Sequence, residues 1–151
     1  DYKNDYGFII SDLRRIRDEY DLTFEAIGVD PHNFDGIRAE LESFGCPVII
    51  VTQSCRSLND ATVDMQLLVK SEKIEYNEND ELLVWSFLNA ETVENSFGEI
   101  KIDKKDGKRN KRIDPVDACI DAHCCKLKNK QDEAVDVQEA LTEYLNAMKS
   151  K

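Results

Sequence analysis

One stretch of the chain reads Arg112-Ile113-Asp114-Pro115-Val116-Asp117-Ala118-Cys119-Ile120-Asp121-Ala122-His123. Asp114 can cap the free backbone N–H groups of a helix, and Pro115 suits the first helical position, where no N–H donor is needed. In such a helix Asp114, Asp117 and Asp121 stand at i, i+3 and i+7 and therefore share one face. We expect this acidic face to hold a divalent metal ion together with Asp30, far upstream.

Helix-like and strand-like segments alternate in the first half of the chain. Residues 24–29 are apolar and end at Asp30, which predicts a buried strand, and residues 47–53 predict a parallel strand covered on both faces. Apolar residues at helical spacing predict helices, which run over about 5–20, 33–45 and 57–69. This order is the alternation typical of an α/β domain.

The second half is predicted to continue with shorter elements and a last helix. We expect a short strand at 74–76, a short helix at 81–89, a hairpin at 92–95 and 99–102, and a helix from Asp114 to about Leu127. After a polar break, Asp132 is expected to start a separate amphipathic helix. The predicted organisation is a domain over 1–131 and a C-terminal amphipathic helix or tail over 132–151.

Composition limits the class of protein. A chain of 151 residues, 41% hydrophobic and 34% charged, suits one globular domain with one core. No apolar run is long enough to span a bilayer, so no membrane partner is expected. The five cysteines are odd in number and form no CxxC pair, which favours a reducing compartment over a disulfide framework or a zinc site.

Charge is unevenly distributed. The net charge of −11 argues against general binding to nucleic acid, but residues 101–112 carry seven basic side chains against two aspartates. The candidate DNA-binding residues in this basic segment are Lys104, Lys105, Lys108, Arg109, Lys111 and Arg112. Lys104 is the candidate contact to a scissile phosphate. The alternative is that the segment is only a solvated, flexible loop.

Several aspartates are candidate metal ligands. Two-metal phosphoryl-transfer sites draw carboxylates from separate elements, and Mg²⁺ and Mn²⁺ prefer oxygen ligands. Asp30 lies at the C-terminal end of a predicted strand, where ligands collect in α/β sheets, and Asp114 can reach the same crevice. We expect Asp117 to be a secondary ligand and Asp121 to be solvated, one turn too far away. In the alternative, Asp30 and Asp114 are a turn residue and a helix cap.

Other chemistries find no support in the sequence. No GxxxxGK[ST] or GxGxxG pattern is present, so a nucleotide-binding loop is not expected. The chain has no GxSxG motif, and neither histidine has an evident nucleophile partner. His123 is expected to be a helix-surface residue rather than a ligand.

Several segments in order resemble one protein family. From Ile10 to His123 the chain resembles the C-terminal nuclease domain of the large terminase subunit of tailed bacteriophages. The matching segments are Ile27-Gly28-Val29-Asp30-Pro31, Gly45 to Gln53 with Ser57-Leu58, Val84-Trp85 to Asn89, Gly98-Glu99-Ile100 with Lys104, and Arg112 to Ala118. The resemblance implies an RNase H-like fold, in which a mixed sheet is flanked by helices.

The resemblance also implies a function. Such a domain is a metal-dependent endonuclease that cuts concatemeric double-stranded DNA by two-metal hydrolysis with Mg²⁺ or Mn²⁺. Asp30 and Asp114 match the second and third metal carboxylates of the family, and Asp117 is their neighbour. The first family aspartate lies on an earlier strand, so we expect this chain to lack it together with the N-terminal central strands.

Partners and alternatives follow from the same resemblance. It implies an ATPase domain upstream, the terminase small subunit and the portal protein as partners, and location in the host cytoplasm. One alternative is a non-catalytic acidic α/β module whose last helix binds a packaging protein. Another is a different RNase H-like nuclease, such as a resolvase or transposase.

Overall fold

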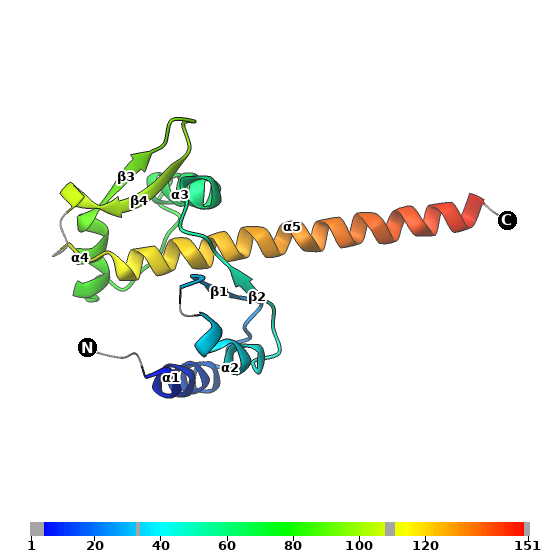
Figure 1. Ribbon diagram of the computed structural model, residues 1–151, viewed down its shortest axis with the longest axis horizontal. Coiled ribbons are helices and arrows are strands. Elements are labelled where there is room, and N and C mark those ends of the chain that lie inside the picture. Colours follow the sequence, from blue (N-terminus) through cyan, green and yellow to red (C-terminus); the bar gives the residue numbers. More distant parts are fainter. Residues whose placement is uncertain (1–4, 33, 108–110, 150–151) are drawn as a thin grey trace.

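The structure of the protein is a computed structural model that describes residues 5–32, 34–107 and 111–149. Within the last helix, side chains are described as far as Lys130 and at Gln138. The described residues form a mixed α/β arrangement, as predicted. Figure 1 shows one long helix crossing the molecule between two groups of shorter elements.

The first group contains two helices and a parallel strand pair. Its elements are α1 (Tyr6–Glu19), β1 (Ile27–Val29), a 3-10 turn (Phe34–Gly36), α2 (Arg38–Glu42) and β2 (Val48–Ile50). β1 and β2 pair in parallel, with Ile27 opposite Val48. The sequence predicted a parallel strand here, but neither its partner nor its register. The Asp5 carboxylate starts α1 by accepting a hydrogen bond from the backbone N–H of Phe8 (3.1 Å). A small core holds this group together, formed by Ile10, Phe34 and Leu41.

The second group contains two helices and an antiparallel strand pair. Its elements are α3 (Cys55–Lys70), α4 (Glu81–Asn89), β3 (Ala90–Glu94) and β4 (Ile100–Lys104). The side chains of Ser54 and Asp80 cap α3 and α4 by accepting hydrogen bonds from Ser57 N and Leu83 N. The two helices and the hairpin that the sequence predicts for this part of the chain are confirmed.

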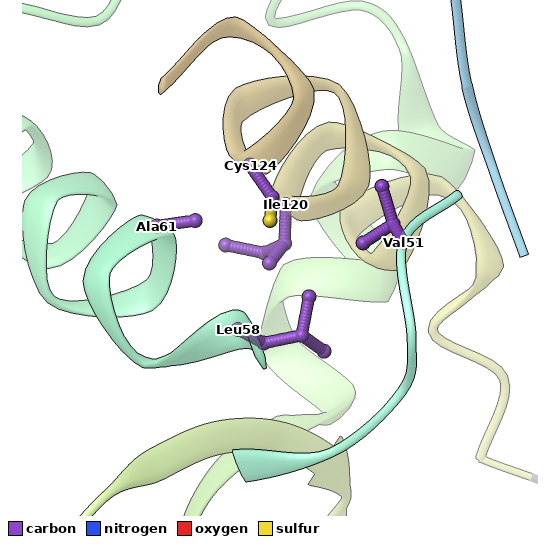
Figure 2. Packing of buried hydrophobic residues seen from close by; sticks show 5 residues of the cluster. All are labelled: Val51, Leu58, Ala61, Ile120 and Cys124. Atoms are coloured by element: carbon purple, nitrogen blue, oxygen red, sulfur yellow. The ribbon is translucent and has the colours of Figure 1, made fainter. Parts of the chain in front are cut away.

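The long helix α5 (Asp114–Lys149) joins the two groups. In Figure 1, α3 and the β3–β4 pair lie on one side of it, α4 lies beside its N-terminal end, and the first group lies on the other side. The main core forms where α5 meets α3 and the segment after β2. Figure 2 shows its buried members, which are Val51, Leu58, Ala61, Ile120 and Cys124. The C-terminal part of α5 extends beyond the other elements (Figure 1).

Several predictions about the elements are wrong. No strand forms at 74–76, because this part of the chain crosses from α3 to α4 with Tyr76 exposed and no strand beside it. The predicted break before Asp132 is absent, and α5 continues through this polar stretch, which contains neither glycine nor proline. Asp114 is the first residue inside α5 rather than the cap before it.

The sheet also differs from the prediction. In the described part of the chain, the parallel pair and the antiparallel pair are separate two-stranded sheets, not one mixed sheet. β2 is not covered on both faces, because Ile50 keeps 43% of its surface exposed. No described helix has the length and hydrophobicity needed to cross a membrane.

Candidate functional site

Asp30 lies directly after β1, where the sequence predicts it. Its Oδ1 accepts a hydrogen bond from the backbone N–H of His32 (2.8 Å), the geometry of a tight turn. The side chain is exposed at the end of the strand. Asp30 is therefore both a turn residue and an accessible carboxylate, so the two interpretations of this residue are compatible.

The aspartates of α5 form the acidic face that the spacing predicts. Asp117 is half-buried between Asp114 and Asp121. Loss of solvent raises the pKa of Asp117 to about 6; the negative charges of Asp121 and Asp114 add to this rise, while the positive charges of Lys101 and Lys104 oppose it. Asp117 is therefore close to carboxylates of its own helix and to lysines of β4.

Asp121 is not the solvated residue that we expected, and this prediction is wrong. Gln53, three residues after β2, donates from Nε2 to both carboxylate oxygens of Asp121 (3.0 Å each). Burial raises the pKa of Asp121, and the charge of Asp30 adds to the rise; the hydrogen bond from Gln53 and the charge of Lys128 oppose it. Asp121 is thus an α5 carboxylate whose pKa is raised by the negative charge of Asp30.

Close packing of β1 against α5 places Asp121 near Asp30. Gly28 has no side chain, and a Cβ there would lie 3.0 Å from Cys125 Cβ and 3.2 Å from the backbone oxygen of Asp121. A larger residue at position 28 would push the strand away from the helix. Gly28 belongs to the segment Ile27-Gly28-Val29-Asp30-Pro31, which resembles the terminase family, but the sequence did not predict that Gly28 packs against α5.

Lys101 on β4 connects the acidic face to the basic segment. Its Nζ donates to the backbone oxygen of Gln53 (3.2 Å), so it braces the same residue that holds Asp121. Neither Lys101 nor Gln53 was a predicted site residue. The sequence does contain a signal for Gln53. It is the last residue of the predicted strand at 47–53, and this strand lies beside the strand that ends at Asp30.

The predicted DNA-binding residues are distributed along the end of β4 and the start of α5. Lys104 is half-buried and acts electrostatically on Asp117. Lys105 and Arg112 are exposed, and Nη1 of Arg112 lies 3.8 Å from Oδ2 of Asp114. Lys111 is half-buried. Lys108 and Arg109 lie outside the described residues.

His123 is paired rather than exposed, and the prediction of a helix-surface residue is wrong. Its Nε2 lies 2.7 Å from Oδ2 of Asp64 on α3, and the side chain keeps only 11% of its surface. The helix turns His123 toward α3, so this pair ties the two helices together. The cysteines are free thiols, with Cys124 and Cys125 buried.

Metal binding by these residues stays a prediction. Within the described ranges, no three His, Cys, Asp or Glu side chains lie close enough together to hold a metal ion. The carboxylates form a row instead, in which Asp114 and Asp121 flank Asp117, and Asp30 lies near Asp121. The predicted set of Asp30, Asp114 and Asp117 therefore spans this row.

The comparisons with known proteins place the chain in a class of endonuclease domains. Residues 5–129 match the family model described as "Terminase large subunit, endonuclease domain". The chain therefore belongs to this family, and the resemblance seen in the sequence is confirmed.

A solved structure supports the fold. The crystal structure of the HK97 bacteriophage large terminase matches with a TM-score of 0.66 at 22% sequence identity. The match covers 80% of this chain and 24% of the HK97 chain, so this chain spans about a quarter of that protein. No curated protein shows significant similarity to the chain.

Proposed function

We propose that this domain is a metal-dependent endonuclease that hydrolyses phosphodiester bonds of concatemeric double-stranded DNA during viral DNA packaging. Membership of the endonuclease-domain family carries this proposal. The row of carboxylates beside Lys101 and Lys104 supports it, because a DNA phosphate near metal ligands needs neighbouring positive charge.

The chemistry of the carboxylates fits Mg²⁺ or Mn²⁺. Both ions prefer oxygen ligands, and the proposed ligands are Asp30, Asp114 and Asp117. Asp117 is crowded by like charges, and a bound cation would relieve that repulsion. When bound, a metal pair supplies an activated water and stabilises the leaving oxygen.

The side chains of this chain have separate roles in the proposal. Lys104 acts electrostatically on Asp117 and is the proposed contact to the scissile phosphate. Gln53 holds Asp121 in place and keeps the end of β2 against α5. The basic segment binds the DNA backbone through Lys105, Lys108, Arg109, Lys111 and Arg112, so binding weakens as salt rises.

The wider context belongs to the proposal as well. We place this domain in an RNase H-like fold whose first catalytic aspartate and ATPase domain lie upstream in the full-length protein. The small subunit and the portal protein are its proposed partners in the host cytoplasm. The division at residue 131 between nuclease domain and C-terminal helix stays a prediction.

Nicking of supercoiled plasmid DNA with Mn²⁺ tests the proposal. The full-length protein that contains this domain should nick the plasmid. Asp30→Ala and Asp114→Ala should each reduce the nicking rate by at least about 100-fold, as loss of a catalytic charge does. Asp35→Ala is the matched control, because its side chain is 96% exposed and has no role in the proposed site. Equal nicking by all four proteins would contradict the assignment of Asp30 and Asp114.

Binding of Mn²⁺, followed by electron paramagnetic resonance, tests the metal ligands without the reaction. The wild-type chain should bind Mn²⁺ more tightly than Asp30→Ala or Asp114→Ala, since each variant removes a carboxylate. Asp35→Ala should bind like the wild type. If all of these proteins bind equally, Asp30 and Asp114 are not ligands.

A further inference from the structure

An apolar groove opens between α3 and α4. It has a volume of about 770 Å³ and is lined mostly by carbon. Met65 and Val69 form one wall, Phe87 and Leu88 form the other, and Ile74 closes one edge. A groove of this size, bounded by two helices, suits a third apolar element.

Large apolar side chains in and around the groove are unusually exposed. Leu88 keeps 71% of its surface exposed, Tyr76 keeps 62%, and Leu67 keeps 56%. Single exposed apolar residues are ordinary, but these belong to one neighbourhood along α3, α4 and the chain between them. Tyr76 and Leu88 both line the groove, and an exposed apolar patch of this kind marks an interaction surface.

The groove is distinct from the acidic face of α5. Cys119 lines it, and Asp117 and Asp121 stand two residues before and after Cys119. Two residues correspond to about 200° around a helix, so these aspartates point away from the groove. A partner in the groove would leave the candidate catalytic face open to DNA.

Negative charge surrounds one edge of the groove. Residues 72–81, which lead from α3 to α4, carry five carboxylates and only Lys73 as a base. Glu72, Glu75 and Lys73 line the groove itself and are exposed, so carboxylates outnumber the base there. Apolar burial in the groove and attraction to its negative edge therefore both favour a partner that has basic residues beside its apolar ones.

We propose that this groove binds an amphipathic helix of a partner protein, with an apolar stripe flanked by lysine or arginine. A helix fits because α3 and α4 present side chains at helical spacing on both walls. The C-terminal helix of a second copy is disfavoured, because residues 132–149 carry five carboxylates against Lys149. This proposal does not depend on nuclease activity.

Fluorescence anisotropy of a labelled peptide tests the proposal with the intact chain. The probe is a helical peptide of about 18 residues with leucine at i, i+3, i+4 and i+7 and lysine on the flanking positions. Binding should weaken about tenfold in Leu88→Ser, and about tenfold in the double variant Glu72→Lys/Glu75→Lys. A peptide with glutamate in place of lysine should bind at least tenfold more weakly to the wild type.

Matched controls separate groove binding from general attraction to an acidic protein. Glu40→Lys/Glu42→Lys changes the net charge equally on exposed positions of α2, and Phe97→Ser removes an exposed apolar side chain in the β3–β4 turn. Both controls should bind the lysine peptide like the wild type. Equal weakening by the two charge-reversed doubles, or no effect of Leu88→Ser, would overturn the proposal.

Two further outcomes also count against it. Absence of measurable binding by the lysine peptide would show that the groove does not accept a basic helix. A dimer seen by sedimentation in the wild type but lost in Leu88→Ser would assign the groove to a second copy instead.

Discussion

Replacing Asp117 with asparagine should stabilise the domain at high pH. The pKa of Asp117 rises from an ordinary 3.8 to about 6, because the side chain is half-buried beside Asp121 and Asp114. A shift of this size corresponds to about 3 kcal/mol if fully expressed. Solvent reaches half of the group and screens it, so we expect Asp117→Asn to gain about 1 kcal/mol at pH 8.

The sign follows from where the proton is bound. The folded state holds the Asp117 proton more tightly than the unfolded state, so this carboxyl destabilises the fold above its folded pKa. The advantage of Asp117→Asn should therefore shrink as the pH falls through about 6 and vanish near the unfolded value of 3.8. Mg²⁺ at pH 8 should stabilise the wild type more than the variant, since a cation relieves the same repulsion.

Urea unfolding in EDTA, followed by the fluorescence of the single tryptophan Trp85, measures this difference. The control is Asp35→Asn, whose side chain is 96% exposed and which should change stability by less than about 0.5 kcal/mol. A difference between Asp117→Asn and wild type that stays constant from pH 8 to pH 4 would refute the reasoning. So would a variant less stable than the wild type at pH 8.

Three other substitutions, the first with a matched control on the same helix, are tested by urea unfolding. Leu58→Ala should cost about 3 kcal/mol because Leu58 is 1% exposed in the core, whereas Leu67→Ala on the same helix, 56% exposed, should cost less than about 0.5 kcal/mol. Gln53→Ala should cost about 1–2 kcal/mol at pH 8, because it removes the donor to both carboxylate oxygens of the half-buried Asp121. Gly28→Ala should cost about 1–3 kcal/mol, because its Cβ would lie 3.0 Å from an α5 side chain, and a cost below 0.5 kcal/mol would contradict that close approach.

Local elements of this fold were predictable because local physics determines them. The start of α1 at Asp5 and the parallel direction of β2 follow from a cap residue and from a continuous apolar run. The end of α2 follows from Gly45, whose φ of +75° a glycine adopts without strain. The end of the last helix was not predicted correctly. The polar stretch around Asp132 looked like a helix boundary, but α5 continues through it.

The candidate site shows the same division. Spacing correctly placed Asp114, Asp117 and Asp121 on one face of a helix, since helical geometry alone decides this. It misjudged Asp121, because the partner that holds this residue is Gln53, 68 positions earlier in the sequence. Only the tertiary fold brings these two together, and no local pattern contains that pairing.

The acidic face exists because the core beneath it is well packed. Ile120 and Cys124 point into the main core, while Asp117 and Asp121 occupy another face of the same turns of α5 (Figure 2). Crowded carboxylates repel one another and disfavour the folded state, so burial of those apolar neighbours must offset the repulsion. If the proposed function is correct, substitutions in the core should therefore weaken the proposed metal binding before they unfold the domain, because the carboxylates are the groups that gain most from moving apart. A mild core variant such as Ile120→Val should accordingly lose Mn²⁺ affinity under conditions where circular dichroism still reports the wild-type helix content.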